Sequence, residues 1–474
     1  MDAGVGIGGR SKSVVSMTTS RLDRKSPQVV EQGVKKRHVE TLHTNSTINT
    51  ENAKIDFNMT ASPDKWCDLS TAMLHGKMGI QIKKKVETVW ESMKTFNDKT
   101  GAKPTWGLVN NVYHSLFSNC IVAVNNHEVG DTSAKAYPYL SYLQTLLSTS
   151  VANSKSHALK EIGFIKDQMT VDGKSEIDTG NDSPYQIRRK PFLTNKMVDF
   201  HIPLQSDLMN MEKYLPPNVE LSFKLQRNDD AFLFWNGTAT PADSQYDYKI
   251  VLEDLSITID MCEVEPSVLE DYRKDFANLP TNKKPPLQKF KFVQNDLKSF
   301  TVATNQTELK KYDLFSSTHL PDKVYVVVVD QMAFNGTSTK NSFNFERSFM
   351  RKAFLKVNQD IVPNPPYEYT AGHNENMCYR TFLENTGTGP FELETVDISN
   401  DEWKNGFCVY AFDRSPTRDN GLYNHYPTSG AMHLTIEMSE PTKKNYMVLV
   451  MACYDKSLVL DEDKASVESL IPPQ

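Results

Sequence analysis

Alternation of apolar and polar side chains along short stretches is the feature that most limits what this chain can fold into. Apolar residues take every second place in 219–225, in 255–261 and in 432–438. Successive side chains of a β-strand point to opposite faces, so this period predicts strands with one buried face. We therefore expect an all-β protein. Five of the inward-facing residues should lie in its core: Leu221, Phe223, Ile257, Leu434 and Ile436.

Continuous apolar runs and turn-forming pairs add further strands to this pattern. The runs 326–329, 407–412 and 446–453 have strand length and fit strands that are covered on both faces. Asn-Gly pairs, which favour tight turns, separate several of these segments. Helical patterns are few, and the clearest are Pro138 to Leu147 and Pro266 to Phe276. So many short strands predict β-sandwiches, and more of them than one sandwich can hold.

A Pro- and Lys-rich stretch, LPTNKKPPL at 279–287, divides the chain into parts of similar size. Each part closes alike, with an alternating strand, a polar connection and then a longer apolar strand. We therefore predict two sandwiches in tandem, at 54–278 and 288–465, followed by a tail at 466–474. No sequence repeat accompanies this likeness.

Residues 1–53 are predicted to form a flexible basic arm, since they are rich in Gly, Ser and Thr without apolar periodicity. The first 50 residues hold eight Lys or Arg and four acids, although the whole chain carries a net charge of −6. Two interpretations stay open: a solvated tail, or an arm that contacts DNA or an inner partner. The second interpretation selects five candidate contact residues: Arg24, Lys25, Lys35, Lys36 and Arg37.

Targeting and redox signals are few. No apolar run approaches the roughly 20 residues of a membrane span, and the N-terminus lacks the apolar core of a secretory signal. The six cysteines are scattered without a CxxC pair. We expect a protein that is neither secreted nor membrane-spanning, with reduced thiols in its core.

Enzyme motifs are absent or lack their structural context. Gly4, Gly6 and Gly9 spell GxGxxG, but no strand precedes them and no helix follows. The sequence holds no P-loop, no HExxH and no GxSxG. We accordingly predict no catalytic residue, no cofactor and no metal site.

Several residue groups nevertheless have a chemical alternative. Cys120, with His114 or His127, has the residue types of a thiol nucleophile and its base, but it alternates within an apolar strand and is interpreted as a core thiol. Asp229-Asp230 has the carboxyl groups that a glycosidase needs, but adjacent acids in a polar loop are typical of a solvated turn. The basic runs at 83–85 and 188–190 are interpreted as surface residues. Tyr137, Tyr139 and Tyr142 are interpreted as packing residues.

One long segment resembles a known family. Residues 108–147 contain HSLFS at 114–118, Asn125 in a turn, and YPY at 137–139 before a Leu-rich helix. This order resembles the major capsid proteins of Polinton (Maverick) elements and adintovirus-like viruses. Three further segments follow in the family's order: FHIPLQSDLMNMEKYLPPNVELSFKLQRNDDAF from Phe200, SNDEWKNGFCVYAFD before Arg414, and SGAMHLTIEMSEP from Ser429. The resemblance covers about residues 55 to 465.

The resemblance implies a double jelly roll of the adenovirus–tectivirus lineage, with two eight-stranded jelly rolls in one chain. It implies a homotrimer that forms a pseudo-hexameric capsomer and tiles an icosahedral shell around double-stranded DNA. It also implies a minor capsid or penton partner, and a location in the virion after assembly in the host nucleus or cytoplasm. Segment 84–106 departs from the family, because it is charged and longer than expected.

Two other functions remain open at this stage. A carbohydrate-binding or carbohydrate-cleaving β-sandwich protein would show a groove lined by carboxylates or aromatic rings. A capsid-derived protein domesticated in a cellular genome would have the same sequence features, and only particle formation or genomic neighbourhood would separate it.

Overall fold

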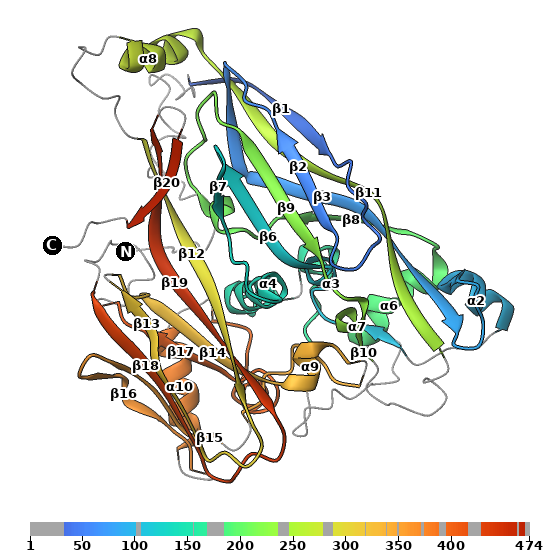
Figure 1. Ribbon diagram of the computed structural model, residues 1–474, viewed down its shortest axis with the longest axis vertical. Coiled ribbons are helices and arrows are strands. Elements are labelled where there is room, and N and C mark those ends of the chain that lie inside the picture. The colour runs from blue at the N-terminus through green and yellow to red at the C-terminus, as the bar shows by residue number, and fades with distance from the viewer. Residues whose placement is uncertain are drawn as a thin grey trace, which may run out of the picture.

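The computed structural model describes thirteen ranges of the chain, which hold two β-sandwiches lying side by side (Figure 1). These ranges are 33–100, 106–154, 156–167, 184–235, 246–277, 288–317, 319–337, 339–347, 350–370, 374–387, 395–415, 428–461 and 464–469.

The first sandwich consists of two antiparallel sheets. One sheet has the order β1-β11-β3-β4, with β8 also paired to β3, and the other has the order β2-β9-β6-β7. Its strands are β1 (Val34–His43), β2 (Lys54–Met59), β3 (Lys65–Lys84), β4 (Glu91–Ser92), β6 (Phe117–Val124), β7 (His127–Val129), β8 (Val198–Pro203), β9 (Leu221–Arg227) and β11 (Tyr246–Val264). A separate pair joins β5 (Gly107–Leu108) to β10 (Phe234–Trp235).

The second sandwich repeats this plan. One sheet has the order β12-β19-β14-β17, with β20 paired to β19, and the other has the order β13-β18-β15-β16. Its strands are β12 (Gln288–Val302), β13 (Glu308–Ser317), β14 (Lys323–Asp330), β15 (Met350–Val357), β16 (Asp360–Glu368), β17 (Val409–Asp413), β18 (Gly430–Met438), β19 (Tyr446–Asp461) and β20 (Lys464–Ser469).

The two sandwiches share one strand order. Each sandwich has eight main strands when the short strands β4, β5 and β10 and the C-terminal strand β20 are left out. Numbered along the chain, one sheet of each sandwich has the order first, eighth, third, sixth, and the other sheet has the order second, seventh, fourth, fifth. This is the order of a jelly roll, so the chain is an all-β double jelly roll. Strands up to Val264 belong to the first jelly roll and strands from Gln288 belong to the second. The expected linker at 279–287 lies outside the described residues.

Strand β1 corrects the expected extent of the basic arm. Residues 34–43 pair with β11 along their length, from Val34 opposite Val264 to His43 opposite Ser256. The sequence lacks apolar periodicity here because β1 is an edge strand held mainly by backbone hydrogen bonds, and only Leu42 is fully buried. Residues 1–32 lie outside the described residues.

Both expected helices are present, as α4 (Ala136–Ser148) and α8 (Pro266–Ala277). The other helical elements lie between strands: α2 (Met93–Thr100), α3 (Val112–Ser115), α5 (His157–Glu161), α6 (Pro184–Thr194), η1 (Asp207–Asn210), α7 (Asp230–Leu233), α9 (Gln331–Asn335), α10 (Glu375–Asn385) and α11 (Asn400–Lys404). Helix α2 lies within the long segment 84–106. Among the residues that the structure describes, no helix is both long and apolar enough to cross a lipid bilayer.

The expected core residues are buried in both jelly rolls. Each of the five is at most 2% exposed: Leu221, Phe223, Ile257, Leu434 and Ile436. Their strands bury one face against the opposite sheet, as the alternation predicts. Buried apolar side chains form one continuous core cluster that includes residues of both jelly rolls. The jelly rolls are therefore packed against each other along a seam.

Candidate functional site at the seam between the jelly rolls

Helix α4 lies between the two jelly rolls (Figure 1). An ordinary surface helix buries one stripe of side chains. Helix α4 buries ten of its thirteen residues, including Tyr137, Tyr139 and Tyr142. One face packs on β6 of its own jelly roll, while another meets the second jelly roll. The helix thus belongs to both cores, and its tyrosines are packing residues, as predicted.

Aromatic rings from both jelly rolls fill the centre of the seam. Tyr142 stacks on Phe343 with ring centroids 4.2 Å apart, and it meets Phe345 at 5.7 Å. Tyr139 lies 5.7 Å from Phe334 and 5.6 Å from Phe343. All five rings are buried. Paired aromatic rings add about 0.5–1.5 kcal/mol each beyond their burial, so this aromatic seam cluster holds the jelly rolls in one relative position.

Polar groups at the start of α4 also cross the seam. The Tyr139 hydroxyl donates to the Ser342 carbonyl at 3.2 Å. The Lys135 ammonium donates to the Phe334 carbonyl at 2.7 Å and lies over the rings of Phe232 and Phe334. Burial lowers the pKa of Lys135. These bonds satisfy buried polar groups and fix the register of the contact.

A buried ion pair supports the seam from the first jelly roll and corrects one sequence interpretation. Arg188 was expected on the surface, but its side chain is 1% exposed and donates to Asp167 at 2.6 Å. Its guanidinium also donates to the carbonyls of Leu108 and Ile165. Asn341 of the second jelly roll donates to the other Asp167 oxygen at 3.4 Å. A guanidinium is tolerated here because three separate acceptors satisfy it.

Further contacts lie near the end of α4. Ser150 and Val396 form an isolated antiparallel bridge between the jelly rolls. The Lys166 ammonium lies 2.9 Å from Glu402 Oε1 and 3.5 Å from Asp397 Oδ2, and both carboxylates belong to the second jelly roll. Despite partial burial, the hydrogen bond from the Ser399 backbone amide and then the Lys166 ammonium lower the pKa of the Glu402 carboxyl group. The seam therefore has an aromatic centre flanked by polar contacts.

The family-like motifs meet beside this seam. His114 of HSLFS and Tyr137 of YPY join through a 2.9 Å hydrogen bond between Nδ1 and the hydroxyl group. Complete burial lowers the pKa of His114 to about 3. Asn125 and Asn126 both have positive φ in the turn between β6 and β7, the backbone that a two-residue hairpin requires. The motif residues thus serve packing and chain reversal.

The residues with a chemical alternative are engaged in the fold. Cys120 is 6% exposed, and burial raises the pKa of its thiol to about 12, which disfavours a nucleophilic thiolate. Asp230 was expected in a solvated turn, but it is 7% exposed and accepts from Arg227 at 2.8 Å and from the Ile250 amide at 3.1 Å. Asp229 accepts from Asn52 at 3.3 Å. The partners of Asp230 explain its burial.

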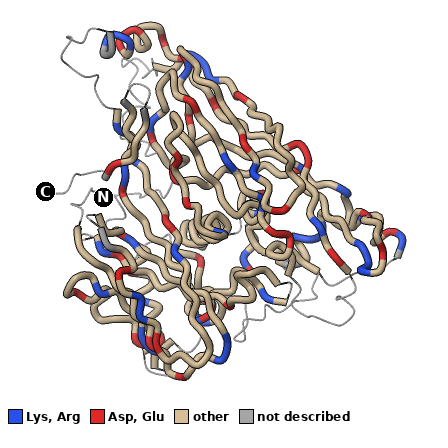
Figure 2. Tube along the Cα trace, viewed as in Figure 1, with Lys and Arg blue, Asp and Glu red and all other residues tan. Residues whose placement is uncertain are grey.

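The structure describes three of the predicted nucleic-acid contact residues. Lys35, Lys36 and Arg37 lie exposed on β1, and Arg24 and Lys25 lie outside the described residues. Arg37 contacts Asp68 at 3.8 Å and donates to the Tyr214 hydroxyl. Acidic and basic residues are interspersed over both jelly rolls rather than gathered in one patch (Figure 2). Within the described ranges, no three His, Cys, Asp or Glu side chains converge as metal ligands would.

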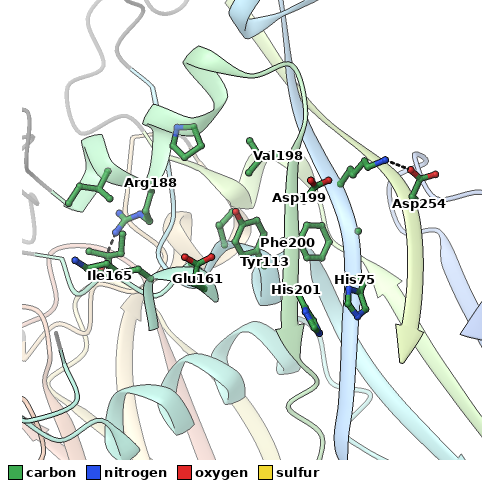
Figure 3. Close-up of a pocket in the computed structure, with 17 residues that line it drawn as sticks. His75, Tyr113, Glu161, Ile165, Arg188, Val198, Asp199, Phe200, His201 and Asp254 are labelled. Atoms are coloured by element: carbon green, nitrogen blue, oxygen red, sulfur yellow. Dashed lines mark hydrogen bonds and ion pairs between the residues drawn. The ribbon is translucent and has the colours of Figure 1, made fainter. Parts of the chain in front are cut away.

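A cavity of about 520 Å³ opens on the first jelly roll beside β8 (Figure 3). His75 and His201 stack there with ring centroids 3.6 Å apart, and the Tyr113 and Phe200 rings stack at 4.9 Å. Lys77 is paired with Asp254 at 2.6 Å. Because cations, anions and apolar rings share its lining, the cavity selects no single class of ligand.

Comparisons with known proteins identify the fold. No protein-family model matches the chain, and no curated protein matches it. Among solved structures, a chain of the Sputnik virophage determined by cryo-EM superposes with a TM-score of 0.58 at 12% identity, covering 95% of this chain and 92% of that chain. The mavirus major capsid protein superposes with a TM-score of 0.52 at 12% identity, covering 100% of this chain and 97% of that chain. At such identity the likeness shows the fold, which is the double jelly roll that the strand order gives.

Proposed function

We propose that this chain is a major capsid protein, a structural subunit that builds a viral shell around double-stranded DNA. The observation that carries the proposal is the packed seam, in which α4 joins two jelly rolls of identical strand order into one body. A shell subunit needs such a fixed relation, because identical subunits tile only when their edges are reproducible. The mavirus major capsid protein, which superposes over the full length of this chain, supports the same function.

A trimer is the proposed building block. Three chains with two similar lobes each present six lobes around one axis, which gives a pseudo-hexagonal capsomer from a closed threefold ring. In such a ring, the first jelly roll of one copy meets the second jelly roll of the next. The capsomer would then tile an icosahedral shell, with a minor capsid or penton protein closing the positions that hexagonal units cannot fill.

Size-exclusion chromatography with multi-angle light scattering tests the trimer. The expected mass is three times that of the chain, and it should persist on dilution to the micromolar range because obligate interfaces bury on the order of 2,000 Å² or more. A stable monomer at that concentration would contradict the proposed building block.

The virus group and location are proposed from the motifs at 114–118, 125 and 137–139. These motifs resemble Polinton and adintovirus-like capsid proteins, so we place the chain in a virion of that group, assembled in the host nucleus or cytoplasm. Expression with the neighbouring genes of its source tests this placement. Closed shells that contain the products of those genes are the expected result, and free capsomers alone would speak against it.

Basic residues near the N-terminus are proposed to contact the enclosed DNA or an inner partner. Lys35 and Lys36 support this role because both side chains are exposed on the edge strand β1, whereas Arg37 already contacts Asp68 and Tyr214. Arg24 and Lys25 would extend the same basic segment.

Salt dependence of DNA binding tests this contact. A plot of log affinity against log salt concentration has a negative slope for such binding. Replacing Lys35 and Lys36 by Ala should make that slope shallower by about 0.9 for each phosphate that the protein no longer neutralises. A matched change of charge on the second jelly roll, Lys310→Ala with Lys443→Ala, should leave the slope unchanged. Equal slopes for both double variants would remove Lys35 and Lys36 from the proposed contact.

A further inference from the structure

A carboxyl group that is not part of the aromatic seam cluster is also buried in the seam. Asp207, on η1 of the first jelly roll, is 6% exposed. Its Oδ1 accepts a hydrogen bond of 2.8 Å from Nδ2 of Asn295, which lies on β12 of the second jelly roll. An acid of one jelly roll is therefore bonded directly to an amide of the other.

Other acids surround Asp207 at this place. Asp131 precedes α4, and its carboxylate accepts from the Leu297 amide of β12 and from the Ser133 amide at 2.7 Å. Asp296, also on β12, is the third acid, and both neighbours act electrostatically on Asp207. Within the described part of the chain, Asp207 forms no ion pair with Lys or Arg. An ionised Asp207 would thus be a buried charge among like charges.

The remaining groups around Asp207 do not supply a positive charge. Asp207 acts electrostatically on the thiols of Cys120 on β6 and Cys453 on β19, and burial raises the pKa of each thiol to about 12, so both stay neutral. Strand β3 also packs against η1, but its acid Asp68 is held by Arg37 and Ser70. Two lysines of this region, Lys298 and Lys456, interact electrostatically with the neighbouring acid Asp296.

We propose that Asp207 forms a proton-dependent contact between the two jelly rolls, closed when its carboxyl group is protonated and weakened when the group ionises. The hydrogen bonds from Asn295 by themselves favour a carboxylate, but burial, followed by the neighbouring acids Asp296 and Asp131, disfavours it more strongly, so ionisation opposes the packed seam. Burial raises the pKa of Asp207 from its usual 3.8 to about 7. The contact would make the relative position of the jelly rolls sensitive to pH near neutrality, whatever the oligomeric state.

The direction of the pH effect follows from this pKa. Between about pH 4 and about pH 7 the unfolded chain loses the proton while the folded chain keeps it. The folded state binds more protons over this range, so the contribution of Asp207 to stability falls as pH rises. Once pH exceeds the pKa of Asp207 in the folded protein, the loss of unfolding free energy from this group is complete.

Thermal unfolding of Asp207→Asn against pH tests the contact, because Asn keeps the shape and the acceptor oxygen without the titration. From about pH 5 to about pH 8.5, the unfolding temperature of the wild-type protein should fall relative to that of D207N by several degrees. Asp254→Asn changes an acid whose side chain is 69% exposed and should leave the wild-type pH profile intact. Parallel profiles for the wild type and D207N would overturn the proposal.

Infrared difference spectroscopy gives a direct readout. The wild-type protein should show a protonated-carboxyl C=O band that titrates near neutral pH and is missing in D207N. Should D207N fail to fold, Asp131→Asn provides a second test, since removing a neighbouring acid should move the midpoint of the band to lower pH. The absence of such a band from the wild-type protein above about pH 5 would also overturn the proposal.

Discussion

At the scale of single residues, stability depends on how many buried contacts a side chain makes across the seam. Tyr142 stacks on Phe343 and also meets Phe345 and Phe164, so one ring from α4 joins both jelly rolls. Truncating such a ring removes its burial and leaves a cavity that the seam cannot refill.

Tyr142→Ala is therefore expected to lower the free energy of unfolding by about 3–5 kcal/mol. Tyr312→Ala is the matched control, because Tyr312 is 67% exposed and its removal should change stability by less than about 0.5 kcal/mol. Chemical denaturation of both variants makes the comparison. Equal losses would mean that the ring of Tyr142 does not hold the seam.

His114, the first residue of the HSLFS motif, makes the stability of the protein depend on pH in the acid range. Because its folded pKa is about 3 and the unfolded value is 6.5, the unfolded chain gains a proton first as pH falls. Stability from the neutral ring is present above about pH 6.5 and is lost as pH falls toward about 3. His114→Gln can still bond to Tyr137 without titrating, so its unfolding midpoint should fall less steeply over that range. A variant profile as steep as that of the wild type would contradict this assignment.

The burial of a single residue could be predicted where apolar and polar residues alternate along its strand. Leu221 and Ile436 could be placed in the core because they alternate with polar neighbours. Arg188 and Asp230 could not, because their burial depends on partners such as Asp167 and the Ile250 amide, which lie 21 and 20 residues away and outside the local pattern. Asp207 carries no local signal of its burial or of its bond to Asn295.

At the scale of elements, edge strands show the limits of predicting strands from hydrophobic patterns. Strands β9, β11, β18 and β19 have the predicted apolar patterns because their side chains enter a core. Strand β1 lacks such a pattern, since it contributes backbone hydrogen bonds to an edge. Its charged side chains also protect that edge from pairing with other chains.

Truncation separates β1 from the residues before it. A chain that starts at residue 33 keeps every described strand pairing and should remain soluble and folded. A chain that starts at residue 44 loses β1 and exposes the edge of β11, the strand that β1 covers. We expect the shorter chain to aggregate, which soluble yield and light scattering would show. Equal solubility of the two chains would mean that β1 is dispensable.

At the scale of the whole molecule, the seam packs two similar jelly rolls into one unit with a continuous core. The two-sandwich plan could be predicted from the strand patterns on both sides of residues 279–287. The contact between the sandwiches could not, because Tyr139 and Tyr142 reveal burial but not their partners Phe334 and Phe343. The proposed role of a shell subunit rests on that packing together with the shared strand order.

Electron microscopy of the expressed protein, alone and together with its neighbouring gene products, tests that role most directly. We expect six-lobed particles from the protein alone, each made of three chains, and closed shells on co-expression. Single two-lobed particles under both conditions would contradict it, because a chain that never associates cannot be a shell subunit.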